Sequence, residues 1–544
     1  MQTPISPDTL TAALTAAPGT ASRLRADPLA AAGYITDVAH IHQYYSHLAP
    51  VMVSYAAALN GGAPAPLGDF DYCEIGCGNG LSLNLHAAVH PDARFVGIDV
   101  NPEQIANARR LAEAGGLANV RYLALDVASA EREALPEFDY ITLHGVYARV
   151  REDVRQGIAA FIGRRLKPGG FALVSYNALP GWAGLEPLRE MMRAYTAGVP
   201  GIGSLERARR GLEYVRYMAE RNAGYFAHQP GAKVLAEHLQ GFDLRYIAHE
   251  YFNEHWTPLY FSQVAREMKE VGLAYAGSLP VETNYLEATV LPAFQELIRS
   301  APSRTLAETH KDFVRDPRFR IDVYARAGAA AAPAEASALF AGFAFALTRP
   351  AEHTPLQGRA GEMDFTLQGA LFPLLIAALA AGPRTLAELR ADPQLADFDA
   401  ADMLAALQQM VLVHAALPAL RSAPPYPGAG AALGLSRFNC ALLEYKLGSD
   451  DADELGLASS LLGTAVQLPR SEALVWMALA AAGRDRAADW LIAWLKARRA
   501  SLLQPGPGGA TDSGPVRTAL AAADEPKRQV LHAMGVLEAV APPG

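Results

Sequence analysis

Between residues 69 and 178 the chain alternates short apolar runs with longer segments in which apolar residues recur every three or four positions. The short runs are "DYCEI", "RFVGIDV", "VRYLALDV", "FDYITLHG" and "GGFALVSYN". Short apolar runs bounded by turn residues are typical of buried strands, and the spacing in "NPEQIANARRLAEAGG" is helical. Strands that alternate with helices predict an α/β fold with a doubly wound, Rossmann-like parallel sheet.

The rest of the chain has a mainly helical pattern. "LERARRGLEYVRYMAERN" and "FSQVAREMKEVGL" are charged amphipathic segments, and the later Ala/Leu-rich stretches are separated by Pro/Gly-rich linkers. We expect five parts: an N-terminal helical segment or lid at 1–68, a core at 69–200, a middle α+β or helical domain at 201–330, a winged-helix-like domain at 331–424 and a helical C-terminal domain at 431–544.

The stretch "EIGCGNG" places three glycines directly after the first predicted strand. Gly76, Gly78 and Gly80 let the backbone turn tightly and let a ligand approach it. The spacing excludes the dinucleotide fingerprint, because Leu81 stands where its third glycine belongs, and the loop lacks the lysine of a phosphate-binding P-loop. Glu74 would repel phosphate but pair with a cation. A ligand with a ribose, an adenine and a positive charge fits better, and S-adenosylmethionine (SAM) is such a ligand.

Polar residues also follow the later strands, at the edge where open α/β sheets bind ligands. Asp99 ends the second strand, where a carboxylate can accept both ribose hydroxyls, and Asp126 ends the third, within reach of an adenine amino group. The fourth and fifth strands are followed by a set that faces the reactive centre: His144, Tyr147, Tyr176 and Asn177. Taken singly, each is a helix cap, a turn or a packing residue. Their order along successive strand ends favours a binding site.

Composition narrows the class of partner. The 544 residues are 51% hydrophobic and 19% charged, with a formal net charge of −9 and a pI of about 5.9. This balance indicates a globular protein and disfavours nucleic acid as a partner, but it permits a basic, lysine-bearing protein. The N-terminus lacks the pattern of a signal peptide, and the longest apolar run, "ALFPLLIAALAA", is too short to span a bilayer. We expect a cytoplasmic protein without membrane insertion.

We expect no metal site. The three cysteines are Cys73, Cys77 and Cys440, and two thiols beside the glycine loop make a weak ligand set. The segment "HIHQYYSHLAP" has three histidines but no carboxylate or cysteine at ligand spacing, which favours a lid or substrate wall. "HEYFNEHW" has the wrong spacing for a zincin.

Four segments resemble class I SAM-dependent methyltransferases: "CEIGCGNG", "FVGIDVNPEQIANAR", "FDYITLHGVYARV" and "LKPGGFALVSYNALPGW". The pair "HGVY" and "SYNALPGW", with "AHEYFNEHWTPLYFSQVAREMKEVGLAYAGS" further on, is similar to bacterial methyltransferases that carry a methyltransferase regulatory domain. These include the rickettsial-type protein-lysine methyltransferases that act on outer-membrane protein. The chain departs from them at Ala148–Val150, where relatives read Ser-Trp-Val.

The resemblance implies SAM as cofactor, without a metal. It implies a protein substrate at the outer membrane or cell surface, and a homodimer. The cofactor-binding residues would be Glu74, Gly76, Cys77, Gly78, Asn79, Gly80, Asp99, Val100, Asp126, Val127 and His144. We expect catalytic roles for His144, Tyr147, Tyr176 and Asn177, and a substrate pocket that includes Tyr44, Tyr45 and Trp182.

The favoured hypothesis is methyl transfer from SAM to lysine ε-amines of a protein by in-line displacement. A free lysine has a pKa of about 10.4 and must arrive neutral, which an apolar aromatic pocket favours by desolvation. Two alternatives stay open. One is a small-molecule N- or O-methyltransferase, and the other is a SAM-binding adaptor without turnover.

Overall fold

The computed structural model describes residues 35, 37–38, 43–328, 336–361, 363–428, 431–446, 454–497 and 514–539. Most of the predicted N-terminal lid, with His40 and His42, lies outside these residues. What is described of it is a 3-10 turn at Ser46–Leu48 and helix α3 at Pro50–Leu59. No helix in the described part of the chain is both long and apolar enough to cross a membrane.

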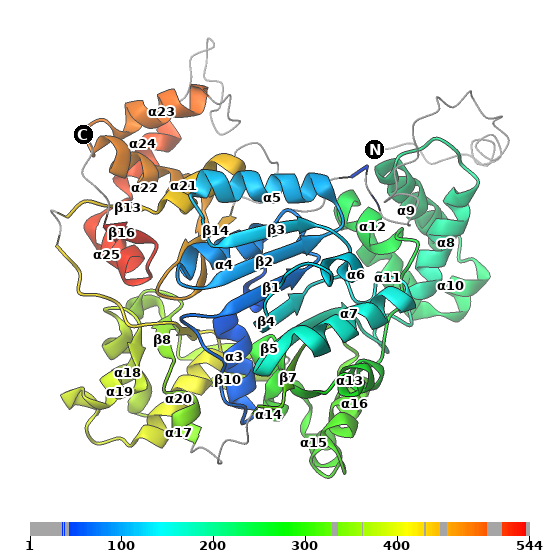
Figure 1. Cartoon of the computed structure of the whole chain (residues 1–544), viewed down its shortest axis with the longest axis horizontal. Helices are drawn as coiled ribbons and strands as arrows, with labels where there is room; N and C mark the ends of the chain where they lie inside the picture. The colour runs from blue at the N-terminus through cyan, green and yellow to red at the C-terminus, as the bar shows by residue number, and fades with distance from the viewer. Residues whose placement is uncertain are drawn as a thin grey trace.

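A seven-stranded sheet forms the centre of the molecule (Figure 1). Its first five strands in sequence are parallel, and its last strand, β7, is antiparallel to both β5 and β6. In spatial order the strands are β3 (Val120–Ala124), β2 (Arg94–Asp99), β1 (Asp71–Ile75), β4 (Phe138–Leu143), β5 (Leu166–Asn177), β7 (Phe319–Arg326) and β6 (Leu273–Leu279). The predicted α/β fold with a Rossmann-like sheet is confirmed.

The sheet extends beyond the predicted core. Strands β6 and β7 come from residues 273–326, on the far side of the expected boundary at residue 200. Strand β7 pairs antiparallel with β5, so residues from the predicted core and from the predicted middle domain form one sheet. The five-part division stays a prediction, but its second and third parts share this sheet.

Alternating side chains along β1 face two different layers. Tyr72 packs in the core formed with α3, α4 (Leu81–Val89) and α5 (Pro102–Gly115). Cys73 packs in the core formed with α7 (Glu152–Arg165) and α13 (Phe261–Glu270). The period of two along a strand therefore buries both faces of the sheet, as a doubly wound fold requires.

Helix α5 begins where its sequence predicts. The Asn101 side chain accepts hydrogen bonds from the backbone N–H groups of Glu103 and Gln104, and Pro102 occupies the first turn. Gly116 ends the helix in the left-handed conformation. Because this helix follows β2 directly, its start is fixed at the edge of the sheet where Asp99 lies.

Helices from the middle of the chain form a separate bundle beside the sheet edge (Figure 1). They are α8 (Glu186–Ala197), α9 (Ser204–Glu220), α10 (Gly224–His228), α11 (Pro230–Leu239) and α12 (Leu244–Tyr251). Two further helices, α15 (Pro292–Arg299) and α16 (Arg304–Arg315), pack against each other between β6 and β7 in sequence. The bundle brings α12 to the carboxyl ends of β4 and β5.

Residues 336–419 form three short strands with three main helices. The strands β11 (Arg384–Thr385), β8 (Ala344–Leu347) and β12 (Ala416–Ala419) make an antiparallel sheet, next to α18 (Leu371–Leu379), α19 (Leu386–Arg390) and α20 (Ala400–Leu412). A hairpin of β9 (Gln357–Ala360) and β10 (Met363–Thr366) lies in the same region. The winged-helix-like assignment stays a prediction.

The described C-terminal part contains short strands as well as the expected helices. Its helices are α21 (Arg437–Lys446), α22 (Arg470–Ala482), α23 (Ala487–Ala497), α24 (Gly514–Ala521) and α25 (Glu525–Ala533). Its strands are β13 (Leu433–Leu435), paired with β16 (Leu537–Ala539), and β14 (Glu454–Ser459), paired with β15 (Thr464–Pro469). This part packs on α4 and α5, since Leu85 and Leu111 belong to its core.

Candidate functional site

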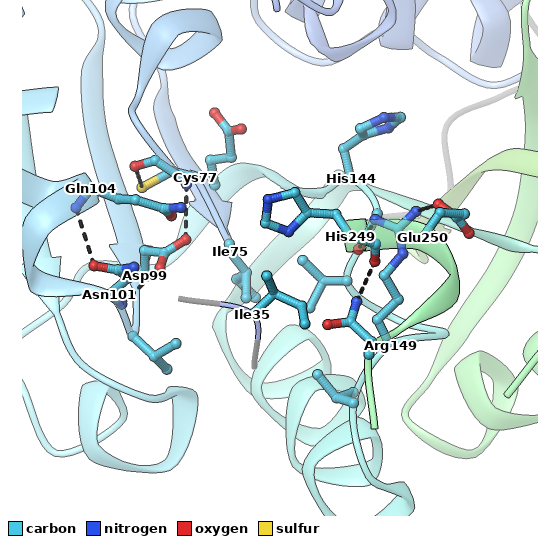
Figure 2. A pocket seen from close by; sticks show the side chains of 18 of the residues that line it. Ile35, Ile75, Cys77, Asp99, Asn101, Gln104, His144, Arg149, His249 and Glu250 are labelled. Atoms are coloured by element: carbon cyan, nitrogen blue, oxygen red, sulfur yellow. Dashed lines mark hydrogen bonds and ion pairs between the residues drawn. The ribbon is translucent and has the colours of Figure 1, made fainter. Parts of the chain in front are cut away.

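A cavity of about 930 Å³ opens at the carboxyl ends of the parallel strands. The loops after β1, β2 and β3 line one side, and the loop after β4 lines the other side together with helix α12 (Figure 2). In Figure 2, Asp99, Asn101, Gln104 and Cys77 lie together, opposite the group His144, Arg149, His249 and Glu250. We call these the cofactor half and the acceptor half.

The glycine loop forms the floor of the cofactor half. Gly76 and Gly80 have φ angles of +72° and +66°. A Cβ at Gly76 would lie 2.4 Å from Val146 Cγ2, and one at Gly80 would lie 2.6 Å from Ala108 Cβ. These two glycines are therefore required by packing. Gly78 has a φ of +54°, but a Cβ there would meet no atom closer than 3.6 Å, so its open side faces the cavity.

Asp99 holds the loop in place from the end of β2. One carboxylate oxygen accepts a hydrogen bond from the Gly78 N–H at 2.9 Å, and the other accepts one from the Asn101 N–H at 2.9 Å. Burial raises the pKa of Asp99 above its usual value, although these backbone hydrogen bonds oppose the shift. Asp99 thus connects the glycine loop to the start of α5, and lines the cavity.

Glu74 is a buried carboxylate with an unsatisfied oxygen. It is 5% exposed, and Oε2 has no hydrogen-bond partner among the described residues. Burial, reinforced by the charge of Asp99, raises the pKa of Glu74 to about 8. A carboxylate left in this state in the wall of a cavity would be completed by a cation, because a buried anion is costly without a partner. The positively charged end of SAM fits this position.

The far end of the cofactor half lies beyond β3. Asp126 caps the short helix α6 (Val127–Ala130), since its Oδ1 accepts a hydrogen bond from the Ser129 N–H at 2.6 Å. Asn79 accepts a hydrogen bond from Asn107 Nδ2 at 2.9 Å, which ties the glycine loop to α5. The predicted cofactor-binding residues that line the cavity are Glu74, Gly76, Cys77, Gly78, Asn79, Asp99, Val100, Asp126, Val127 and His144; Gly80 lies behind it, at the cap of α4.

His144 of the acceptor half is held by contacts with the sheet and with the N-terminal segment. Its Nδ1 is 3.1 Å from Ser175 Oγ and 2.9 Å from Nε2 of His47. The ring of Tyr45 lies over it, with centroids 4.1 Å apart. Burial lowers the pKa of His47 to about 4, so this histidine is neutral at pH 7. The N-terminal segment therefore contributes Tyr45 to the cavity wall and holds the His144 ring through His47.

A buried ion pair forms the wall of the acceptor half. Glu250 on α12 is 3% exposed and pairs with Arg149, while its Oε1 accepts a hydrogen bond from Asn177 Nδ2 at 2.6 Å. Asn177 ends β5, lines the cavity and has an Oδ1 without a partner among the described residues. Because Nδ2 is committed to Glu250, the amide orientation is fixed.

Sequence reasoning missed Arg149 and Glu250 as a pair. Arg149 stands at the departure from "Ser-Trp-Val", and Glu250 belongs to "HEYF", which drew attention only as a failed zinc motif. The possible signal was a basic residue in place of an aromatic one, together with an acidic residue on a later helix. This signal can be interpreted only once the structure shows that the two residues are in contact.

Three of the predicted tyrosines lie outside the cavity. The hydroxyl of Tyr147 donates to Glu267 Oε2 at 2.6 Å, and that of Tyr176 donates to Asp322 Oδ2 at 2.6 Å. Tyr44 lies 2.6 Å from Thr464 Oγ1, on the C-terminal part. Strand alternation explains Tyr176, because its neighbour Asn177 faces the cavity. Their positions give no support to catalytic or substrate-binding roles, whereas Trp182 does line the cavity.

No group of three histidine, cysteine or acidic side chains in the described part of the chain could hold a metal ion. The cysteine pair of the glycine loop is buried in apolar surroundings, and burial raises the pKa of Cys77 well above its usual value. A protonated thiol is a poor metal ligand.

Comparisons with known proteins identify the class. Residues 73–172 match the family described as "Methyltransferase domain", and residues 243–326 match "Predicted methyltransferase regulatory domain". The chain is 33% identical over 450 residues to the protein sll1526 of Synechocystis sp. The aligned region covers 82% of this chain and 87% of that protein. It is 29% identical over 279 residues to RP789 of Rickettsia prowazekii, covering 51% of this chain and 49% of RP789.

The fold also matches a solved structure, that of PKMT2 from Rickettsia typhi in complex with AdoHcy. The TM-score is 0.68 at 18% identity, over 92% of this chain and 99% of that one. The protein is a SAM-dependent methyltransferase. The chain belongs to the methyltransferases that carry a methyltransferase regulatory domain, the family that includes sll1526.

Proposed function

We propose that this enzyme methylates lysine ε-amines of a protein. The observation that carries the proposal is the acceptor half of the cavity. Aromatic side chains from four separate parts of the chain line it, and the oriented carboxamide of Asn177 and the Glu250 carboxylate lie among them; the aromatic residues are Tyr45, Trp182, Phe242, Tyr246, Tyr251 and Phe319. This lining combines desolvation with hydrogen-bond acceptors, which is what an amine nucleophile requires.

The chain's own residues have two tasks. When bound, SAM supplies a methyl group on a positively charged sulfur, open to attack by a nucleophile. Glu74 and Asp99 hold the cofactor, and the rigid loop between β1 and α4 fixes it against the sheet. The aromatic wall disfavours the charged ammonium form of the acceptor, so the neutral amine is favoured by burial.

Asn177 is suited to orienting the amine. A carboxamide oxygen accepts a hydrogen bond from an amine N–H and leaves the nitrogen lone pair free for attack. Glu250 keeps that oxygen from turning away by holding Nδ2, and Arg149 holds Glu250. His144, fixed by Ser175 and His47, is placed to receive a proton that the amine sheds.

The resemblance to rickettsial-type protein-lysine methyltransferases supports a protein acceptor, with an outer-membrane or surface protein as the first candidate and a homodimer as the working assembly. The roughly 350 residues that follow the predicted 69–200 core also favour a large acceptor, since a small molecule needs only a lid.

The test is incubation of purified enzyme with methyl-labelled SAM and a dialysed cell lysate, followed by separation of protein from small molecules. We expect label in discrete protein bands, absent with Asp99→Asn, with circular dichroism as the check that this variant folds. Label that is incorporated only after small molecules are restored would favour a metabolite acceptor. SAM binding without any transfer would favour the adaptor.

A further inference from the structure

Three exposed aromatic residues belong to segments around the end of β5, where Asn177 lines the cavity. Phe319 and Tyr260 are each 36% exposed and Phe313 is 60% exposed. Single exposed apolar residues are common on protein surfaces, but several large exposed aromatic side chains near one cavity indicate a binding surface. We call these three residues the aromatic track.

The track starts inside the cavity. Phe319 lines the cavity, and its ring meets His144 edge-on with centroids 5.4 Å apart. Phe319 opens β7, where it pairs with Asn177 at the end of β5. One end of the track therefore lies beside the two residues placed to orient the acceptor.

The track then leaves the cavity along the surface. The Leu259 N–H donates a hydrogen bond to the Asn177 carbonyl at 3.0 Å, and Tyr260 is the next residue. Phe319 pairs with Asn177 from the other side of β5. The rings of Tyr260 and Phe313 have centroids 6.1 Å apart. Phe313 lies near the end of α16, six positions before Phe319.

We propose that the aromatic track binds an extended, apolar segment of the protein acceptor, next to the residue that is methylated. This inference rests on the proposed function. Alternate side chains of an extended chain repeat every ~7 Å, close to the 6.1 Å between the outer two rings. The acceptor's apolar residues at every second position would meet successive rings while the methylated side chain enters the cavity. The regulatory-domain segment, which supplies all three residues, is then a substrate-binding element.

Phe319 lines the cavity, and Tyr260 follows a residue bound to the Asn177 carbonyl, which argues for the acceptor rather than for a second copy of the chain. A separate apolar stripe on α15, formed by Leu291, Phe294 and Leu297, is also exposed but does not reach the cavity. Self-association through these helices is an outcome that the experiment must distinguish.

The experiment compares two synthetic peptides with the same central lysine. One has leucine or valine at alternate flanking positions, and the other has serine there. The enzyme is the full chain, as wild type, as the double variant Tyr260→Ser/Phe313→Gln, and as the control Val234→Gln. Serine suits the N-cap position of Tyr260 on α13, and glutamine is a good helix former for α16. Val234 is 66% exposed on α11, away from the cavity lining.

We expect the wild type to use the apolar peptide about tenfold better in kcat/KM, mainly through KM, since truncated aromatic anchors typically cost a factor of this order. The double variant should lose this preference, and Val234→Gln should keep it. Calorimetry should show the same SAM affinity for all three proteins.

Three results would overturn the inference. The wild type could use both peptides equally, or the double variant could keep the preference, and in either case lysine methylation itself would stand. The double variant could instead change the mass in analytical ultracentrifugation, which would make the track a contact between copies. If neither peptide is methylated while SAM binds, the proposed acceptor fails and the inference falls with it.

Discussion

At the scale of single residues, Glu74 is the side chain that we propose recognises the positive charge of the cofactor. Its carboxylate is buried with one oxygen unsatisfied, and burial and Asp99 together raise its pKa to about 8. The free protein therefore holds a proton on Glu74 at neutral pH, where we propose that the positive charge of the cofactor binds. The folded protein is more stable when Glu74 is protonated, whereas binding of a cation requires its ionised form.

The first prediction concerns Glu74→Gln. The folded pKa of about 8 lies above the unfolded value of 4.5, so the folded state binds more protons in that window and wild-type stability falls as pH rises through it. Relative to the variant, the wild type should lose about 4 kcal/mol between pH 5 and pH 9. Urea unfolding at several pH values measures this difference, with exposed Glu103→Gln as the control.

The same variant tests cofactor recognition. Below pH 8 a cation must displace the Glu74 proton, so wild-type SAM affinity should fall by about tenfold per pH unit on acidification. In Glu74→Gln the affinity should be weaker and nearly independent of pH. An equal pH dependence in both proteins, measured by calorimetry, would show that Glu74 does not meet the cofactor's positive charge.

The second prediction concerns Glu250. Glu250→Gln removes the charge that Arg149 pairs with, and its single amide oxygen cannot accept from both Arg149 and Asn177 in the way that the carboxylate does. We expect kcat/KM to fall by about 10- to 100-fold, since misplacing a positioning residue has effects of this size, while SAM affinity stays within about twofold. The double variant Arg149→Gln/Glu250→Gln should regain stability, because no unpaired charge remains, but not activity.

At the scale of elements, the turn from β1 to α4 determines the site. Gly76 and Gly78 both need positive φ, but only Gly76 is packed against a side chain, that of Val146. The third prediction is that Gly76→Ala costs about 3 kcal/mol, and Gly78→Ala about 1 kcal/mol, which is the cost of the left-handed conformation alone. Both should weaken SAM binding. Gly68→Ala has open space and should change neither.

The element order of the sheet was largely readable from the sequence. The run "DYCEI" coincides with β1, and the Asn-Pro start of α5 was written in "NPEQ". Strands β6 and β7 were missed as parts of this sheet, because "LAYAGSL" and "FRIDVYAR" are separated from it by the helical bundle and only long-range pairing joins them. Local periodicity carries no information on which distant strand a segment pairs with.

The sequence pointed to residues in both halves of the cavity. Glycines and acidic residues at strand ends have fixed local consequences, so Glu74 and Asp99 could be proposed for the cofactor half. Asn177 and Tyr45 were proposed as well, and both line the acceptor half.

The Arg149–Glu250 pair could not be predicted, because it depends on α12 folding back to the sheet, which the sequence does not encode locally. The hydroxyl groups of Tyr147 and Tyr176 donate to partners that lie over 100 residues away, which local sequence does not reveal either.

At the scale of the whole molecule, the C-terminal part supports the cofactor half. Phe438 on α21 is 3% exposed and lies so close to α5 that a Cβ on Gly115 would be 2.7 Å from its ring. It shares a core with Leu85 of α4 and Leu111 of α5. The C-terminal part therefore packs against α4 and α5, the two helices next to the glycine loop, and stabilises their positions.

The fourth prediction follows from this packing. Phe438→Ala should cost about 3–5 kcal/mol, the usual price of an aromatic deletion in a core, and should lower SAM affinity although the residue lies outside the cavity. Leu356→Ala, at a side chain that is 40% exposed, serves as the control. Unchanged SAM affinity in a destabilised Phe438→Ala protein would show that the brace does not reach the site.

The central claim is that the methyl group goes to a lysine of a protein. The most direct measurement is mass spectrometry of the acceptor after incubation with enzyme and isotope-labelled SAM, with the modified residue located by fragmentation. We expect labelled methyl groups on lysine side chains, absent with Asp99→Asn. Labelled methyl groups on another residue type, or on no protein while SAM binds, would contradict it.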